Sequence, residues 1–312
     1  MKKDIQNKVH VFCPASLANV SCGFDVLGIA LDTPGDHMWV ERIPEPKVEM
    51  VHLDGYNLPL IPEENVAGKA ALEIIKDLKL NFGFKITIDK KIHPGSGVGS
   101  SSASASGVVY GINCLLEEKL TEAQMLHYAM VGEYVASASY HADNIGPALL
   151  GGIFLVRGYD PLDYIKIPTP EELWVCIITP KIEIRTQDAR KVLKNKVSLK
   201  QAITQWGNLA GLIAGFYTSN YELIGRSLED VIVEPQRSPL IPLFSNLQEM
   251  GKKAGALGVG ISGSGPSVFG LCKGEETAQK VCEAFQEVYQ KANLPFEIYK
   301  SKVNEKGVKL LD

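Results

Sequence analysis

Several features that would assign a chain to a specialised class are missing from this sequence. No stretch approaches the ~18–20 consecutive apolar residues that span a bilayer as a helix. Basic residues are not in excess, because 32 Lys and Arg against 36 Asp and Glu leave a net charge of −4. This balance argues against a protein that binds the phosphate backbone of nucleic acids. The cysteines contain no C-x-x-C pair and indicate reduced, buried thiols; they are Cys13, Cys22, Cys114, Cys176, Cys272 and Cys282.

What is present is typical of a soluble globular protein with two domains. The 312 residues exceed the size of one ordinary core. Residues 1–8 are polar and lack the apolar core of a signal peptide, so we expect a cytoplasmic protein. The Pro-containing stretch Gly158–Pro170 is the candidate linker. We therefore expect an N-terminal domain over 1–160 and a C-terminal domain over 161–312.

Short strands and amphipathic helices account for the first half. Apolar or alternating runs predict strands at Val9–Cys13, Ile29–Leu31, His37–Arg42, Lys85–Ile88 and Ile153–Arg157. Helical spacing predicts helices over Asn65–Leu78, over Ser101–Glu118 and from Thr121, where Gln124 completes a capping box. A polar loop is expected at His141–Pro147.

The second half has a different order of elements. Strands are predicted at Leu173–Thr179, on both sides of the turn Ser262–Pro266, and at Phe296–Lys300. Helices are predicted over Ser198–Phe216, Tyr221–Asp230, Ile241–Ala254 and Glu275–Lys291. This is the order of a ferredoxin-like split βαβ layer with extra helices. We expect an α+β fold with an N-terminal mixed β-sheet/helix domain and a C-terminal ferredoxin-like domain.

The segment that carries most chemical information runs from Pro94 to Ser104, with the sequence PGSGVGSSSAS. Glycines allow backbone N–H groups to converge on an anion without interference from Cβ atoms. The predicted helix that follows offers free N–H groups and the positive end of its dipole, which suit a phosphate. Serine hydroxyls in its first turn suit phosphate oxygens or a Mg²⁺ ion. The alternative is a flexible turn that caps an ordinary helix.

Two commoner nucleotide loops are excluded by the spacing. A Walker A loop requires Gly-Lys-Ser/Thr at its end, and this segment contains no lysine. A dinucleotide fingerprint requires G-x-G-x-x-G, whereas the glycines here follow G-x-G-x-G.

The loop resembles the central motif of the GHMP kinases, Pro-x-x-x-Gly-Leu-Gly-Ser-Ser-Ala, with Val98 and Ser102 as substitutions and one residue fewer after Pro94. Two other motifs of that family are present in order. Pro14–Asn19 is followed by Gly23–Gly28 near the N-terminus, and Gly258–Phe269 resembles the third motif. The resemblance covers almost the whole chain and implies a two-domain GHMP kinase that uses ATP and Mg²⁺.

Further residues resemble the homoserine kinase branch of this family. They are Asn19 with Gly-Phe-Asp25, His141-Ala-Asp-Asn144, Thr186-x-x-Ala-Arg190 and Glu234-Pro-x-Arg237. The stretch Val20–Cys22 departs from the usual family sequence but keeps the spacing of Asn19 and Asp25. The resemblance implies phosphorylation of L-homoserine, an early step of threonine biosynthesis, by a cytoplasmic enzyme that forms a homodimer and binds neither nucleic acid nor membrane.

The predicted metal ligands are Glu133 and Ser101. Glu133 lies in a predicted helix that is apolar almost all round, and a carboxylate buried there requires a partner. The resemblance makes that partner Mg²⁺, shared with Ser101 and the phosphates. The alternative is an exposed helix carboxylate. The other residues expected to bind the nucleotide are Pro94, Gly95, Ser96, Gly97, Val98, Gly99, Ser100, Ser101, Ser102 and, at the adenine, Asn65.

The polar segment from His141 to Asn144 is expected at the reacting hydroxyl. Asn144 occupies the position where several GHMP relatives have an aspartate base, and an amide cannot accept a proton usefully. The resemblance therefore implies that Asn144 aligns the hydroxyl by hydrogen bonding. His141 would contact the substrate or serve only as a structural hydrogen-bonding group, and Asp143 would orient its neighbours.

Arg190 and Arg237 are the candidates for the substrate carboxylate, because guanidinium groups bind carboxylates with two hydrogen bonds. Arg190 is also a candidate for stabilising charge on the transferred group. A solvated helix face is the competing interpretation. Asn19 and Asp25 would hold the ammonium and hydroxyl ends, although Asp25 also suits a simple turn. Gly263 would let the backbone approach the substrate or form only a tight hairpin.

Two other functions stay open at this point. One is a GHMP kinase for a different alcohol, such as mevalonate or a sugar, against which Asn144 and the paired arginines argue. The other is a ligand sensor of the same fold without catalysis. The presence of Glu133, Ser101 and the whole loop disfavours a sensor, since binding alone does not require a metal ligand.

Overall fold

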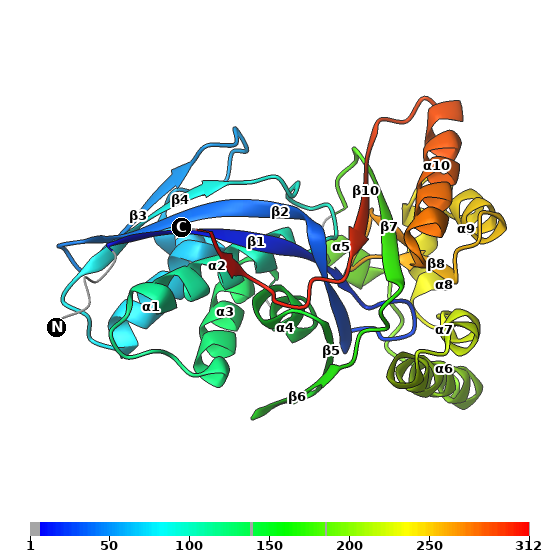
Figure 1. The fold of residues 1–312 in the computed structure, drawn as a ribbon, viewed down its shortest axis with the longest axis horizontal. Helices are drawn as coiled ribbons and strands as arrows, with labels where there is room; N and C mark the ends of the chain where they lie inside the picture. Colours follow the sequence, from blue (N-terminus) through cyan, green and yellow to red (C-terminus); the bar gives the residue numbers. More distant parts are fainter. Residues whose placement is uncertain (1–6, 138–139, 185, 312) are drawn as a thin grey trace.

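The computed structural model describes residues 7–137, 140–184 and 186–311 and arranges them in two sheets with helices packed against them (Figure 1). Residues 1–6, part of the polar N-terminal segment considered above, lie outside the described residues. Within the described ranges, no helix is both long enough and apolar enough to cross a membrane.

Among the described residues, the first sheet is mixed and has seven strands. They are β1 (Lys8–Ala18), β2 (Leu27–Ile43), β3 (Val48–His52), β4 (Gly83–Asp89), β5 (Ile153–Tyr159), β6 (Leu162–Ile167) and β11 (Lys309–Leu310). The order is β11-β1-β2-β4-β3, with β5 paired to β2 and β6 to β5. Only β3 and β4 are parallel among these pairs. In β1, Val9, Val11 and Cys13 alternate inward and are buried, as expected for a strand with one covered face.

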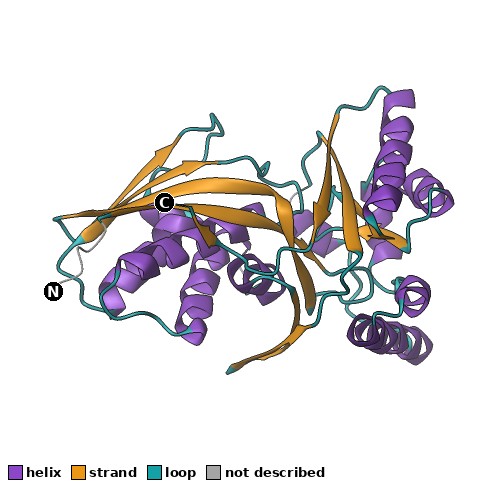
Figure 2. Cartoon of the chain, viewed as in Figure 1, coloured by secondary structure: helices purple, strands orange, loops and turns teal. Residues whose placement is uncertain are grey.

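Helices cover one face of this sheet, as Figures 1 and 2 show. They are α1 (Val66–Asp77), α2 (Ser100–Leu115), α3 (Glu122–Ser137) and α4 (Ala142–Leu150), preceded by the short η1 (Pro62–Glu64). Asn65 caps α1 by accepting hydrogen bonds from the N–H groups of Ala67 and Gly68. The predicted capping box of Thr121 and Gln124 is present at the start of α3.

The second sheet has the order β10-β7-β9-β8 and is antiparallel throughout. Its strands are β7 (Leu173–Pro180), β8 (Gly258–Ile261), β9 (Val268–Lys273) and β10 (Phe296–Lys302). The helices are α5 (Thr186–Lys191), α6 (Leu199–Thr218), α7 (Tyr221–Ser227), α8 (Glu234–Arg237), η2 (Ser238–Leu240), α9 (Phe244–Lys253) and α10 (Glu275–Lys291). The predicted α+β class and the ferredoxin-like second sheet with inserted helices are therefore confirmed.

The predicted loop at His141–Pro147 was wrong, because the structure has helix α4 there. Pro147 lies inside this helix and removes one hydrogen-bond donor, which made the segment resemble a loop. Packing compensates for the loss. A Cβ atom placed on Gly28 of β2 would lie 1.6 Å from the carbonyl oxygen of Asp143, and one on Gly146 would lie 2.3 Å from the Phe154 ring. Two glycines thus let α4 lie directly on the sheet.

The candidate linker also differs from the prediction. Strand β6 lies within it and forms an antiparallel hairpin with β5, with Tyr159 paired to Leu162. Charged residues such as Asp163 and Lys166 alternate with apolar ones on this edge strand. The two strands predicted at Ile29–Leu31 and His37–Arg42 are parts of one long strand, β2. The domain boundary at 160/161 stays a prediction.

Candidate active site

Three segments that are far apart in the sequence meet at one cavity of about 620 Å³. The backbone N–H of Ser16 donates to the carbonyl oxygen of Val98 over 3.2 Å and joins the N-terminal segment to the glycine loop. The hydroxyl of Ser262 donates to the carbonyl oxygen of Gly97 over 2.7 Å and joins the loop to the C-terminal turn. The fold therefore brings the three sequence motifs together.

Positive φ angles shape the glycine loop. Gly95, Gly97 and Gly99 have φ values of 73°, 86° and 69°, a region that other residues rarely adopt. A Cβ atom on Gly97 would also lie 2.5 Å from the carbonyl oxygen of Gly265. The loop can pack this closely against the C-terminal turn only because residue 97 is a glycine. It leads into α2, whose first turn lines the cavity. The N–H groups at a helix N-terminus have no intrahelical partner and suit an anion.

Glu133 of α3 is buried beside the first turn of α2, with 4% of its surface exposed. The hydroxyl of Ser101 donates to its Oε1 over 2.9 Å, and that of Ser102 donates to its Oε2 over 3.1 Å. Burial raises the pKa of Glu133 to about 7, although the two hydroxyls and the charge of Lys90 act to lower it. A buried carboxylate with nearby hydroxyl oxygens is a donor set that suits a hard cation such as Mg²⁺.

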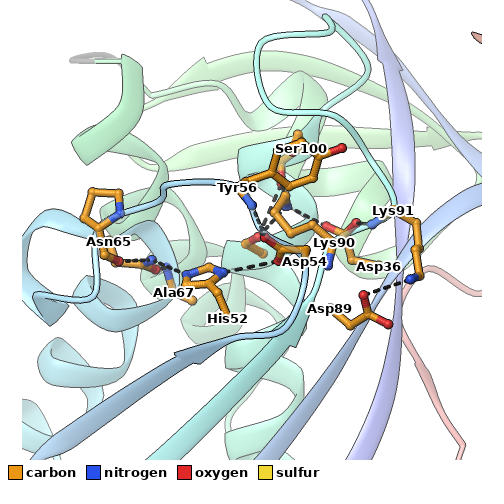
Figure 3. A network of polar contacts seen from close by, with 12 residues as sticks. Asp36, His52, Asp54, Tyr56, Asn65, Ala67, Asp89, Lys90, Lys91 and Ser100 are labelled. Carbon is orange, nitrogen blue, oxygen red and sulfur yellow. Dashed lines mark hydrogen bonds and ion pairs between the residues drawn. The ribbon is translucent and has the colours of Figure 1, made fainter.

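A buried lysine supports the same helix turn from the other side (Figure 3). The Nζ atom of Lys90 donates to Oδ2 of Asp36 over 2.6 Å, to the carbonyl oxygen of Ser100 over 3.0 Å and to the hydroxyl of Ser104 over 2.9 Å. Asp36 also accepts from the backbone N–H of Lys91. All three ammonium donors are thus used within the protein, as a buried charge requires.

The network continues to the start of α1, as Figure 3 shows. Asp54 accepts from the backbone N–H of Lys90 over 3.1 Å. His52 joins Asp54 to Asn65, with its Nδ1 atom 3.4 Å from Oδ2 of Asp54 and its Nε2 atom 3.3 Å from Nδ2 of Asn65. Because an amide nitrogen only donates, Nε2 is the acceptor and Nδ1 carries the proton. This chain fixes one wall of the cavity.

An ion pair lines another part of the cavity. Nη1 of Arg190 donates to Oδ2 of Asp25 over 3.0 Å, and the two side chains are 43% and 34% exposed. Asp25 has a φ of 58°, so it is also the turn residue that its sequence context suggested. The Asn19 amide holds this turn, because it accepts from the N–H of Asp25 and donates to the carbonyl oxygen of Gly263.

Arg237 lies behind the ion pair and is buried. Its Nη1 donates to the carbonyl oxygen of Gly263 over 2.9 Å, and its Nε donates to that of Ala189 over 3.1 Å. The guanidinium also lies 5.0 Å from the ring centroid of Phe24. Burial lowers the pKa of Arg237. The side chain therefore organises the C-terminal turn while lining the cavity.

The start of α4 also lines the cavity. Asn144 accepts a hydrogen bond from the hydroxyl of Ser16 through Oδ1 over 2.7 Å. Asp143 is buried, and His141 Nδ1 lies 3.9 Å from its Oδ1. Burial and the carboxylate of Asp25 raise the pKa of Asp143 to about 7. Burial lowers the pKa of His141.

Most of the predicted site residues line this cavity: Asn19, Asp25, Asn65, Pro94, Gly95, Gly97, Gly99, Ser100, Ser101, Glu133, His141, Asn144, Arg190, Arg237 and Gly263. Ser96, Val98 and Ser102 do not line it and are buried. Sequence reasoning missed Lys90 and His52. Lys90 precedes the loop by four residues, but nothing in its local sequence distinguishes a buried lysine from the exposed Lys91.

Family models match two parts of the chain. Residues 65–152 match the GHMP kinases N terminal domain, and residues 210–291 match the GHMP kinases C terminal domain. The homoserine kinase of Chloroherpeton thalassium is 41% identical, over 97% of this chain and 99% of its own. The homoserine kinase of Xylella fastidiosa is 39% identical, over 98% of this chain and 94% of its own.

Solved structures similar to this chain include a homoserine kinase and a mevalonate kinase. The homoserine kinase of Cytophaga hutchinsonii superposes with a TM-score of 0.96 at 43% identity, covering 100% of this chain and 99% of that chain. The mevalonate kinase of L. major in complex with R-mevalonate has a TM-score of 0.74 at 14% identity, covering 97% of this chain and 99% of that chain. At that identity the likeness shows the fold alone.

Proposed function

The chain belongs to the GHMP kinase family, and on this premise we propose that it transfers the γ-phosphate of ATP to the hydroxyl of L-homoserine. The product is O-phospho-L-homoserine, an intermediate of threonine biosynthesis. The observation that carries the proposal is the charge layout of a single cavity. A glycine loop at a helix N-terminus lines one part of it, and a carboxylate paired with a guanidinium lines another. We call these parts the phosphate end and the acceptor end.

The phosphate end fits a nucleoside triphosphate. The backbone of Gly95–Gly99 and the first turn of α2 would hold the phosphates, and Asn65 with its neighbours would form the wall at the adenine. Glu133 and Ser101 would ligate Mg²⁺, which characteristically uses one or two carboxylates together with phosphate oxygens. When bound, the ion neutralises charge that develops on the phosphates. Lys90 keeps the helix turn and the loop in place before the nucleotide arrives.

The acceptor end fits an amino acid that carries an alcohol. Arg190 and Arg237 supply positive charge for the carboxylate, and Asp25 supplies negative charge for the ammonium group. Asn19 would add contacts to the ammonium or hydroxyl end. The exposed Arg190–Asp25 pair is worth little by itself, so a zwitterion that replaces each partner's charge can enter between them. Gly263 and His141 complete this end.

The hydroxyl would lie near Asn144, between the two ends. An amide cannot take the proton of an alcohol, so Asn144 would orient the hydroxyl. As the new O–P bond forms and the bond to ADP breaks, the hydroxyl proton would pass to an oxygen of the transferred phosphoryl group. Phosphoryl transfer depends mainly on positioning and on charge stabilisation, which this arrangement supplies. We place the enzyme in the cytoplasm, as a homodimer that acts on small molecules and binds neither nucleic acid nor membrane.

The test is an ADP-release assay with Mg·ATP on L-homoserine, mevalonate, galactose and L-serine in parallel. We expect turnover on L-homoserine and background rates on the other three. Turnover on mevalonate or galactose alone would identify another alcohol kinase of the family. ATP binding without turnover on any of the four would favour a sensor.

A further inference from the structure

The turn from Asn19 to Asp25 has an unusual backbone. Asn19, Val20, Ser21 and Asp25 have φ values of 71°, 43°, 63° and 58°. This left-handed region is uncommon for residues other than glycine, and for a β-branched residue such as Val20 it is an outlier. A conformation of this kind persists only where the surrounding structure holds it in place. Contacts outside the turn therefore decide where Asn19 and Asp25 lie in the cavity.

Cys22 connects this turn to two helices of the second half of the chain. Its thiol donates to the carbonyl oxygen of Ser227, the last residue of α7, over 3.4 Å. Its own carbonyl oxygen accepts from Nε2 of Gln205, in α6, over 3.2 Å. Figure 1 shows α6 and α7 side by side. Within the described part of the chain, neither Cys22 nor Gln205 lines the cavity, so their effect on a substrate is indirect.

The Gln205 amide uses both of its N–H groups and its oxygen. Nε2 also donates to Oδ1 of Asp230 over 2.9 Å, and Oε1 accepts from the backbone N–H of Val231 over 3.0 Å. Asp230 is buried and accepts from the backbone N–H groups of residues 232–234, over 2.9 Å each. These groups lead into α8, so Asp230 fixes the start of the short helix that carries Arg237.

One amide therefore contacts both segments that supply charge to the acceptor end. We propose that Gln205 is a positioning residue, which sets the distance between the turn with Asp25 and the helix with Arg237. The inference rests on the proposed function, in which these two side chains bind the ammonium and carboxylate groups of the substrate. Both groups of an α-amino acid are attached to one carbon atom. A shift of about 1 Å between the two segments therefore weakens one of the two contacts.

Two other amides of α6 show what is particular to Gln205. Asn208, one turn further along, donates to the carbonyl oxygen of Glu229 over 2.9 Å, and Gln201, one turn earlier, donates to that of Val231 over 3.3 Å. These hydrogen bonds reach the loop before α8, whereas those of Gln205 reach both the loop and the turn. The loop stays attached to α6 when Gln205 is replaced, so we expect the variant to fold.

The first experiment compares Gln205→Met with Asn208→Leu by steady-state kinetics with Mg·ATP and L-homoserine. Methionine keeps the length and the helix propensity of glutamine but removes its three hydrogen bonds. In Gln205→Met we expect the KM for L-homoserine to rise about 10–30-fold and the KM for ATP to change less than about twofold, because the displaced groups lie at the acceptor end. Asn208→Leu loses one hydrogen bond to the loop and should change neither KM more than about twofold.

A second variant separates the donors of Gln205 from its acceptor. Gln205→Glu keeps an oxygen for the N–H of Val231 and loses both N–H donors, so it should raise the KM for L-homoserine as much as Gln205→Met does. Circular dichroism verifies that all variants are folded. A merely structural role would lower the stability of the variants and leave both KM values of the folded enzyme unchanged.

Hydrogen exchange with mass spectrometry tests the connection without a substrate. In Gln205→Met, peptides over 19–26 and 230–237 should exchange at least about fivefold faster than in the unaltered chain. Peptides over 95–105, at the phosphate end, should exchange at the unaltered rate. In Asn208→Leu, peptides over 19–26 should also keep the unaltered rate.

Several results would overturn the proposal. They are an unchanged KM for L-homoserine in Gln205→Met, an equal rise of both KM values, the same rise in Asn208→Leu, and unchanged exchange over 19–26. An unaltered chain that phosphorylates a different alcohol would contradict the proposed function instead. The exchange over 19–26 would then still decide whether Gln205 holds the turn.

Discussion

The two ends of the cavity use ion pairs in opposite ways. At the phosphate end, Lys90 and Asp36 have side chains 2% and 0% exposed, and both are surrounded by further hydrogen bonds. At the acceptor end, Arg190 and Asp25 are 43% and 34% exposed. Breaking a buried pair leaves an uncompensated charge, whereas opening an exposed pair costs little. The first pair therefore belongs to the scaffold, and the second is available to a charged substrate.

The largest expected effect tests the buried pair directly. Lys90→Met should lower the free energy of unfolding by about 3–5 kcal/mol, because Asp36 is left buried without its partner. Arg190→Met, the matched change in the exposed pair, should lower it by less than about 1 kcal/mol. Urea unfolding at pH 7 measures both. Adding Asp36→Asn to Lys90→Met should restore part of the loss; equal losses in the two single variants would contradict the comparison.

The next effect concerns catalysis at the phosphate end. Glu133→Gln removes the carboxylate proposed to ligate Mg²⁺ and should lower kcat about 10²–10³-fold, the usual cost of one lost electrostatic contact to the transition state. Ser102→Ala, which loses a contact to Glu133 but does not line the cavity, should lower kcat less than about tenfold. Initial rates across a Mg²⁺ titration measure both. A Glu133 variant with an unchanged Mg²⁺ dependence would remove this residue from the metal site.

The same carboxylate should make stability depend on pH. Burial raises the pKa of Glu133 from 4.5 to about 7, so the folded chain binds more protons than the unfolded chain in this range. Stability from this group is therefore highest below pH 4.5 and falls as the pH rises to about 7. The loss is at most about 3 kcal/mol.

Urea unfolding between pH 4.5 and 8 measures this loss. Glu133→Gln should be more stable than the unaltered chain at pH 8 and similar to it near pH 4.5. Parallel pH curves for the two proteins would show that Glu133 is not the group responsible.

A smaller effect is expected at the acceptor end. Arg237→Leu should raise the KM for L-homoserine about 30–100-fold, because it removes a guanidinium proposed to bind the substrate carboxylate. The KM for ATP should change less than about threefold, since the nucleotide would bind at the other end. Arg226→Leu, an exposed arginine of α7, is the control and should change neither value. Equal increases in both KM values would exclude Arg237 from substrate selection.

The smallest effect is expected between the two ends. Asn144→Asp keeps the oxygen that accepts from Ser16 and should change the free energy of unfolding by less than about 1 kcal/mol. Urea unfolding measures this value. A loss as large as that of Lys90→Met would mean that the Asn144 amide supports the fold as much as the buried pair does.

Sequence patterns predicted the regular parts of this fold well. The helices with strong spacing, such as α6 and α10, lie within one or two residues of their expected bounds at most ends. Helix α4 and strand β6 were missed because their local sequences contain Pro147 and the Asp160–Pro161 pair, which are typical of loops. Packing of Gly28 against α4 and pairing of β6 with β5 decide these regions, and neither is visible in the local sequence.

By itself, the sequence determined the fold class and the glycine loop, because these depend on local chemistry and spacing. Its resemblance to the GHMP kinases indicated most of the predicted residues that line the cavity. The tertiary structure alone decided which charges are buried. Lys90 and Lys91 are neighbours with the same side chain, yet one is enclosed beside Asp36 and the other is exposed. Burial depends on what packs around a residue from distant parts of the chain, and it determines whether an ion pair supports the scaffold or is available to a substrate.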